Sequence, residues 1–325
     1  MVYIPGTWNG AGSCIAPGTS LAIAGTGTGA CSTASNYQAR SLLVLQGAAN
    51  ATGTPSQGNS GLGYSYGGGG SVLIGDGGMG NYHGLITSLN HRLSSTFSML
   101  ANWTYSKCLD IVDEQGDIAS TNVENPNNPS LDYGPCGFDY RHIENFVVVA
   151  RSNFSFGNTL EKAVVNGWEI APLIHIQTGA PFSVTLGSGS SNDVSLTDVN
   201  NDRANLVPGQ PIYAKVPQFF AGQGAANRQY LNKAAFTTAP TGTYGNTGRN
   251  AFRAPPAFQM DAQLSRIFPI HERLNMALRL EAFNVLNHPN FGTPTATISS
   301  GTFGQIGGTN LTSARVFQGA IKFTF

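Results

Sequence analysis

The stretch Arg315-Val-Phe-Gln-Gly-Ala-Ile-Lys-Phe-Thr-Phe325 closes the chain and alternates between two kinds of side chain without a break. A period of two residues is typical of a β-strand whose two faces meet different environments. Aromatic rings at the end of an apolar face favour a strand that leaves lipid hydrocarbon and meets the headgroups. For this stretch alone, an edge or core strand of a soluble sheet is the alternative. The more apolar face carries Arg315, Phe317, Gly319, Ile321, Phe323 and Phe325.

The composition agrees with a membrane-spanning sheet. Only 10% of the 325 residues are charged and 41 are glycine, whereas about 25% of residues are charged in soluble proteins. Hydrophobic residues reach 41%, but we find no run of about eighteen apolar residues, so no membrane-spanning helix is expected. Because alternating strands hide membrane segments from hydropathy averages, these values fit an outer-membrane barrel better than a helical bundle.

The alternating pattern recurs upstream. Short turns and long loops separate the repeats in alternation, and outer-membrane barrels place short turns in the periplasm and long loops outside. We therefore predict an all-β fold, an antiparallel transmembrane β-barrel that is partial, with about seven or eight strands and long extracellular loops. Strands are expected at residues 82–92, 96–107, 144–156, 165–178, 257–267, 273–287 and 315–325, with a possible short strand at Tyr37 to Leu45.

The two faces of these strands predict two environments. Glu169, His175, Asp261, Arg279 and Glu281 are expected to face the barrel interior, where water or a plug tolerates them. Pro172 argues against the strand at 165–178, because proline removes one ladder hydrogen bond. Aromatic residues on the apolar face predict a membrane girdle of Phe97, Trp103, Tyr105, Phe154, Phe156, Trp168, Phe323 and Phe325.

The strand count suggests a piece of a larger barrel. Counted back from Phe325, about seven clear strands occur, and the first would start outside the cell. Single-chain bacterial barrels normally have an even number of strands with both ends in the periplasm. We expect residues 1–80 to be a Gly/Ser-rich extracellular loop region and residues 81–325 to be a C-terminal barrel segment.

Four cysteines form two sequence-local pairs in loop-like stretches. Neither pair has the spacing of a zinc or redox site, so an even count in loop-like stretches suggests disulfides that staple loops in an oxidising compartment, with free thiols as the alternative. The expected pairs are Cys14 with Cys31 and Cys108 with Cys136.

No motif predicts an enzyme, a cofactor or a nucleic-acid partner. No catalytic triad order or nucleophile elbow is visible, the six histidines do not cluster, and the net charge is zero without a basic run. Asp198, Asn200 and Asp202 match the first oxygen ligands of a calcium loop, but Arg203 stands in place of the required glycine and Gly209 in place of the final glutamate. A solvated polar loop is the favoured interpretation, and no metal is expected.

Several runs resemble a known family. They are Asn81 to Arg92, Leu100 to Asp110, Gly242-Thr-Tyr-Gly-Asn-Thr-Gly-Arg-Asn250 and Arg279-Leu-Glu-Ala-Phe-Asn-Val-Leu-Asn-His288. Over residues 80–325 the chain is similar to the C-terminal barrel of TonB-dependent outer-membrane receptors, in the Oar-like group common in Acidobacteria. The resemblance implies the bacterial outer membrane as location, with outer-membrane lipid as a partner and the C-terminal strand available to the barrel-assembly machinery. It also implies a 22-stranded barrel with an N-terminal plug that imports siderophores, cobalamin or glycans with energy relayed by TonB.

The chain departs from that family pattern in its first part. No signal peptide, plug or TonB-contacting segment is visible, so TonB would be a partner only of a full-length form, and the extracellular ligand is unknown. The first hypothesis is the barrel portion of a TonB-dependent receptor. A small self-contained outer-membrane or cell-surface adhesin or binding barrel is the alternative, and a soluble β-sandwich enzyme is a distant third.

Overall fold

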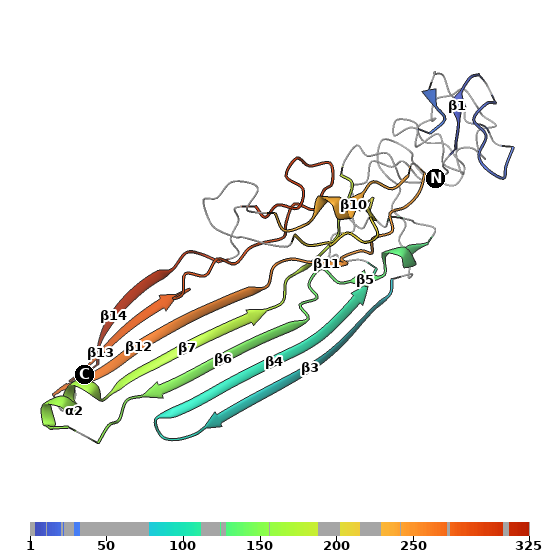
Figure 1. Cartoon of the computed structure of the whole chain (residues 1–325). Coiled ribbons are helices and arrows are strands. Elements are labelled where there is room, and N and C mark those ends of the chain that lie inside the picture. The colour runs from blue at the N-terminus through green and yellow to red at the C-terminus, as the bar shows by residue number, and fades with distance from the viewer. Residues whose placement is uncertain are drawn as a thin grey trace, which may run out of the picture.

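Seven long strands form one antiparallel sheet in the computed structural model of the chain (Figure 1). The structure describes residues 4–10, 12–20, 22, 29–32, 78–111, 124, 128–155, 157–187, 202–214, 229–240, 242–271, 274–307 and 312–324. The spatial order is β14-β13-β12-β7-β6-β4-β3, which confirms the antiparallel all-β fold class. The strands are β3 (Gly80–Arg92), β4 (Phe97–Asp110), β6 (His142–Arg151), β7 (Trp168–Gln177), β12 (Ala257–His271), β13 (Leu274–Phe283) and β14 (Val316–Thr324).

The register brings the apolar face of every strand onto the same side of the sheet. Cross-strand partners share a face, and one row of successive partners is entirely apolar. That row runs through Leu89, Ala101, Phe146, Ile174 and Met260. In this register the apolar positions of each strand pair with the apolar positions of the next strand, whereas a shift by one residue would pair them with polar positions.

The adjacent row, on the other side, is entirely polar. It consists of Ser88, Asn102, Asn145, His175 and Gln259 on the same five strands. The five residues expected to face the interior all lie on this polar face. Along these two rows the sheet therefore separates an apolar side from a more polar side.

The sheet is open within the described residues. β3 and β14 are its two edges and do not pair with each other (Figure 1). Six successive antiparallel pairings connect them, and each pairing reverses the direction. The two edge strands therefore run in the same direction.

The two ends of the sheet differ in their connections. Short turns join β3 to β4 and β12 to β13, and the C-terminus lies at the same end (Figure 1). Long connections lie at the opposite end. They contain the two-residue strands β5 (Gly134–Pro135), β8 (Pro181–Phe182), β9 (Asn205–Leu206), β10 (Phe236–Thr237) and β11 (Phe252–Arg253), and the 3-10 turns η4 (Pro129–Asp132) and η6 (Lys233–Ala235).

Several predicted strand ends were wrong. β4 continues to Asp110, three residues past the predicted end, because β5 pairs with its last two residues. β6 ends at Arg151 rather than Phe156, since the chain turns at Gly157 (φ +91°) and enters helix α2 (Thr159–Val165). β13 ends at Phe283, where Asn284 adopts a left-handed conformation with φ of 49°.

Pro172 lies inside β7 despite the objection raised by the sequence. The β7–β12 ladder is continuous there and pairs Ala262 with Pro172. The β6–β7 ladder is interrupted between the Val147–Leu173 and Ala150–Ile170 pairs. The missing N–H of the proline is thus accommodated on the β6 side only.

A small disulfide-linked unit lies near the start of the chain. β1 (Thr7–Trp8) pairs with β2 (Gly29–Ala30), and Ile4 and Ala16 are buried beside a disulfide. The possible strand at Tyr37 to Leu45 lies outside the described residues. No helix among the described residues is long and apolar enough to cross a membrane.

Candidate functional site

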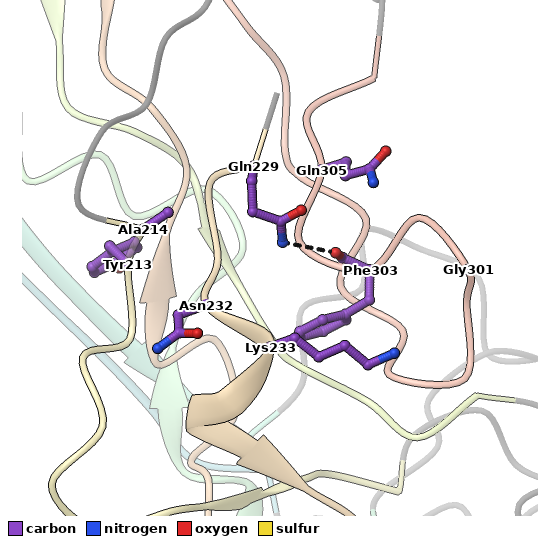
Figure 2. Close-up of a pocket in the computed structure, with 8 residues that line it drawn as sticks. All are labelled: Tyr213, Ala214, Gln229, Asn232, Lys233, Gly301, Phe303 and Gln305. Atoms are coloured by element: carbon purple, nitrogen blue, oxygen red, sulfur yellow. Dashed lines mark hydrogen bonds between the residues drawn. The ribbon is translucent and has the colours of Figure 1, made fainter. Parts of the chain in front are cut away.

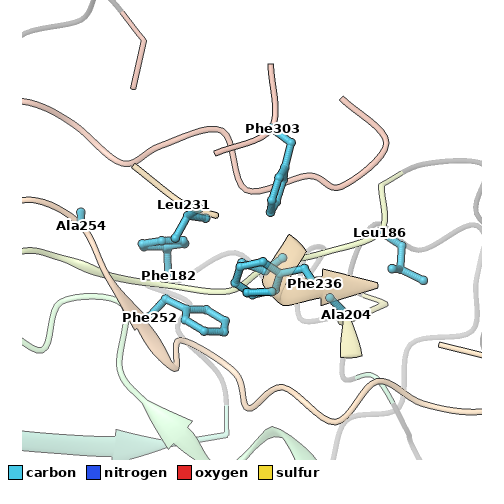
Figure 3. Packing of buried hydrophobic residues seen from close by; sticks show 10 residues of the cluster. Phe182, Leu186, Ala204, Leu231, Phe236, Phe252, Ala254 and Phe303 are labelled. Carbon is cyan, nitrogen blue, oxygen red and sulfur yellow. The ribbon is translucent and has the colours of Figure 1, made fainter. Parts of the chain in front are cut away.

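The long connections pack into a structured cap, here called the loop layer. It lies at the end of the sheet opposite the C-terminus (Figure 1). It comprises the described residues of 124–141, 178–187, 202–214, 229–256 and 284–307. Its apolar centre lies off the sheet, and Figure 3 shows Phe236 placed between Phe252 and Phe303. Both ring pairs meet edge to face, at 5.3 and 5.5 Å between centroids. The core consists of Phe182, Val184, Leu186, Ala204, Leu231, Ala235, Phe236, Phe252, Ala254 and Phe303.

Three arginines from the β7–β12 connection bind acidic residues at the end of β4 and in the connection after it. The first, Arg203, is only 4% exposed. Its guanidinium forms ion pairs with Glu124 and Asp132 and donates from Nε to the Thr247 carbonyl at 2.8 Å. Its backbone N–H donates to Glu124 at 3.0 Å. A buried charge held by two carboxylates fixes the two connections to each other, because removing one partner would leave a charge unpaired in the interior.

The second arginine lies in the Gly242 to Asn250 run that carries the family resemblance. Arg249 donates from Nε to the Asp132 carbonyl at 2.6 Å and forms an ion pair with Asp110. Gly245 in the same run passes so close to the Arg203 carbonyl that a Cβ would lie 2.0 Å from its oxygen. The run therefore joins the connections that follow β4 and β7, and no ligand is needed to explain its composition.

The third arginine, Arg253, binds Asp139 together with Arg141. The Cys108 backbone N–H also donates to the Asp139 carboxylate, at 2.8 Å. Burial by itself would raise the pKa of the Asp139 carboxyl. The hydrogen bonds from Arg253 and Cys108 and the charges of both arginines outweigh burial and hold that pKa below its ordinary value of 3.8. Asp139 therefore stays ionised although its side chain is buried.

Asparagines take over backbone pairing where the β13–β14 connection leaves the sheet. The Asn290 side chain accepts from the Phe258 N–H and donates to the Phe258 carbonyl, both at 2.8 Å. Asn284 donates its backbone N–H to the Asp261 carboxylate at 2.8 Å and its side-chain amide to the Ser313 carbonyl at 3.0 Å. The Glu-Ala-Phe-Asn-Val-Leu-Asn-His run thus anchors the loop layer to β12.

An open pocket of about 520 Å³ lies at the surface of the loop layer (Figure 2). Gln229 is held in place by donating from Nε2 to the Phe303 carbonyl at 3.0 Å. Burial raises the pKa of the nearby Tyr230 hydroxyl to about 12, with a further contribution from Tyr213. Among its described lining residues Lys233 is the only charged one. The lining includes Tyr213, Gln229, Asn232, Lys233, Phe303 and Gln305.

Hydrogen bonds link polar side chains along the polar face of the sheet. Asn145 and His175, on neighbouring strands, share a bond of 2.7 Å, and Ser88 donates to Asn102 at 2.7 Å. Glu169 pairs with Arg151, Arg279 lies 3.5 Å from Glu281, and Gln259 donates to Asp261 at 3.0 Å. These bonds make this side of the sheet the more polar one, although Leu100, Val147 and Leu173 also lie on it.

The cysteines form two disulfides. The structure joins Cys14 to Cys31 and Cys108 to Cys136. Cys108 lies inside β4, so the second disulfide fixes the start of the loop layer to the sheet. The two sulfurs lie near the Asp110 carboxylate, but they are bonded to each other and Asp110 binds Arg249, so this group offers no metal site.

The weak calcium candidate is only partly visible. Asp202 is buried, and its backbone carbonyl accepts from the Leu186 N–H at 2.8 Å. Asp198 and Asn200 lie outside the described residues. A buried Asp202 differs from the solvated polar loop that the sequence favoured, because the residue lies next to Arg203 at the centre of the loop layer.

The expected girdle residues lie towards both ends of the apolar face. Phe97, Trp168 and Phe323 are near the turn end. Trp103 and Tyr105 lie closer to the loop layer, where both contact the His142 ring. Phe154 follows β6 rather than belonging to it, and Phe156 and Phe325 lie outside the described residues. Phe268, also at the turn end of the apolar face, was missed because the predicted strand stopped at Ile267.

The apolar face of the sheet could be covered by membrane lipid or by a second sheet, and comparison with known families distinguishes the two. The model of the outer membrane beta barrel domain matches residues 15–318. The chain belongs to this outer-membrane barrel family. No curated protein and no solved structure matches the chain.

Membership places the barrel strands in the bacterial outer membrane. The apolar face is therefore the lipid-facing surface, and the polar face lines the lumen. The loop layer lies outside the cell, since long loops are extracellular in such barrels. Sequence reasoning missed the ion pairs of Arg203, Arg249 and Arg253, because their partners lie 71 to 139 residues away and no local pattern marks them.

We predict that Leu264→Arg destabilises the barrel and Gln263→Arg does not. Leu264 lies at the centre of β12 on the lipid-facing surface, and its neighbour Gln263 faces the lumen. An arginine facing lipid near the bilayer midplane costs about 2–4 kcal/mol. Guanidinium titration of the protein assembled in outer-membrane lipid measures the difference. Equal losses for both variants would show that the faces are assigned wrongly.

We predict that acid loosens the loop layer through Asp139. Its folded pKa is lowered, so its contribution to stability is complete above an unfolded pKa of about 4 and is lost as the pH falls through the lower folded value. Hydrogen exchange at residues 128–141, corrected for intrinsic rates, should rise below pH 4 in the wild type. Asp139→Asn should exchange faster at neutral pH and lose most of the acid dependence. An unchanged acid dependence in that variant would contradict the assignment.

Proposed function

We propose that this chain is the C-terminal barrel portion of a TonB-dependent receptor or transporter. In the full-length form, further strands, a plug and a TonB-contacting segment would complete it, and the function would be uptake of an extracellular ligand. The resemblance of residues 80–325 to such receptors supports the proposal, and so does the geometry of the two sheet edges.

The direction of the edge strands is the observation that carries the proposal. Because β3 and β14 run the same way, joining them directly would require a parallel seam in an otherwise antiparallel barrel. An antiparallel closure requires an odd number of additional strands. A barrel of 22 strands would need 22 minus 7, which is 15, and this number is odd. In lipid, each unpaired backbone group at an open edge costs several kcal/mol, so closure is obligatory.

The polar wall and the loop layer suit the two tasks of a receptor. A lumen lined by Asn145, His175, Glu169 and Arg279 gives a plug hydrogen-bonding partners along its length. The loop layer offers a structured outer surface on which a ligand would first be bound, with the pocket at Lys233 as one place for it. In this proposal residues 81–325 form the barrel portion and residues 1–80 an extracellular loop region. The barrel-assembly machinery would bind β14.

A self-contained adhesin or binding barrel is the alternative. The packed loop layer favours it, because a rigid outer surface held by ion pairs and a disulfide can bind a partner without any energy source. This alternative needs one further membrane-spanning strand to close the sheet antiparallel. The only candidate in the sequence, Tyr37 to Leu45, lies outside the described residues.

The size and the energy requirement of the natural protein separate the two functions. An antibody against the loop layer should detect, in outer membranes of the producing cells, a polypeptide much larger than 34.1 kDa. Growth on the transported ligand should be lost when TonB is deleted. A heat-modifiable protein of 34.1 kDa whose binding does not depend on TonB would overturn the receptor proposal and support the adhesin.

A further inference from the structure

The connection between β6 and β7 differs from the other turns at its end of the sheet. Residues 93–96 join β3 to β4 and residues 272–273 join β12 to β13, whereas residues 152–167 join β6 to β7 and contain α2. The helix is well formed for its length. Asn158 and Glu161 make a capping box with reciprocal bonds of 2.9 Å. The β6–β7 connection therefore contains a capped helix at an end of the sheet where the other two connections are short turns.

The C-terminal end of α2 is held by side chains from the lipid-facing surface. Trp168 donates from Nε1 to the Val164 carbonyl at 2.9 Å. Arg266, its cross-strand partner on β12, donates to the same carbonyl at 2.8 Å and to the Ala163 carbonyl. Both side chains belong to the apolar face. The end of the helix therefore lies over the outside of the barrel.

Aromatic rings surround the arginine that makes this contact. The Arg266 guanidinium carbon lies 5.3 Å from the centroid of Trp168 and 4.5 Å from that of Phe268. A cation held by helix carbonyls and two rings is stable at the boundary between hydrocarbon and water. Tryptophan and arginine at the end of a spanning strand are typical of that boundary. The level of α2 is therefore that of the headgroups.

The helix also presents an apolar stripe to its surroundings. Leu160 and Val164, one turn apart, are 75% and 61% exposed, and Phe154 before the helix is 45% exposed. Lys162 lies on the opposite side of the helix and is also exposed. Nothing in the described part of the chain covers the stripe. Its position continues the lipid-facing surface of β7 and β12 beyond their ends.

We propose that α2 is an interfacial anchor that binds the periplasmic leaflet of the outer membrane. Leu160 and Val164 insert among the acyl chains beside the barrel, and Lys162 extends to the phosphate groups and water. The partner is a phospholipid surface. The anchor fixes the depth and rotation of the β6–β7 hairpin in the bilayer. This inference depends only on membership of the outer-membrane barrel family, and it applies equally to a receptor and to an adhesin.

Spin labels on the two sides of the helix test the anchor. Nitroxide labels are attached to Leu160→Cys and, as the matched control, to Lys162→Cys in the full chain in outer membranes; the native cysteines are bonded in disulfides and do not react. Oxygen, which concentrates in lipid, and a water-soluble nickel chelate are used as relaxing agents. The ratio of oxygen to nickel accessibility should be several-fold higher at position 160 than at 162.

Two results would overturn the proposal. Equal ratios at the two positions would show that the helix has no lipid-facing side, whether it lies in periplasmic water or against another protein. A higher ratio at 162 would show that the helix is rotated away from the barrel surface. Both labelled positions are exposed and make no side-chain contact needed for folding among the described residues, so the variants should assemble like the wild type.

Discussion

The need to pair every backbone hydrogen-bonding group within lipid is the constraint on which the rest of this structure depends. It explains why seven strands with very few charges form one continuous sheet, and why Pro172 is accepted with the interruption on one side only. It also requires that both edges of a sheet in lipid be paired, and among the described residues the two edges of this sheet are not. β3 and β14 each present a free edge, and because these edges run in the same direction they are poor partners for each other. Pairing both edges in lipid therefore needs backbone outside the described sheet.

The loop layer shows how a barrel can carry a rigid outer surface. Its core is apolar, but the connections are held together by Arg203, Arg249 and Arg253, which bind acidic residues at the end of β4 or after it. Buried ion pairs of this kind add little net stability, because desolvation offsets their attraction, but breaking one leaves a buried charge unpaired. The arrangement keeps the pocket beside Lys233 on a fixed frame. A ligand-binding role for the loop layer is thus compatible with both proposed functions.

The sequence predicted the sheet well and the loop layer poorly, for physical reasons. A two-residue period reports the two faces of a strand directly, so the faces of β4 and β14 were correct before any contact was known. Two-residue strands such as β10 have no period, and the Arg203–Asp132 pair spans 71 residues. Helix α2 did carry a local signal, the Asn158 and Glu161 capping box. It was missed because residues 157–164 were interpreted as the connection between two expected strands, at 144–156 and 165–178.

Disulfide trapping at the two edges tests the central claim most directly. Cysteines would be placed in the outer-membrane protein at Gln318 on β14 and, in turn, at Ile86, Ser88 or Asn90 on β3. Ser88→Cys with Asn102→Cys is the positive control, since these residues are partners in the β3–β4 ladder. The account predicts that the control cross-links and that no β3–β14 combination does, because other strands separate these edges in the closed barrel. An efficient cross-link within one chain would show that the seven strands close on themselves, and it would contradict the account.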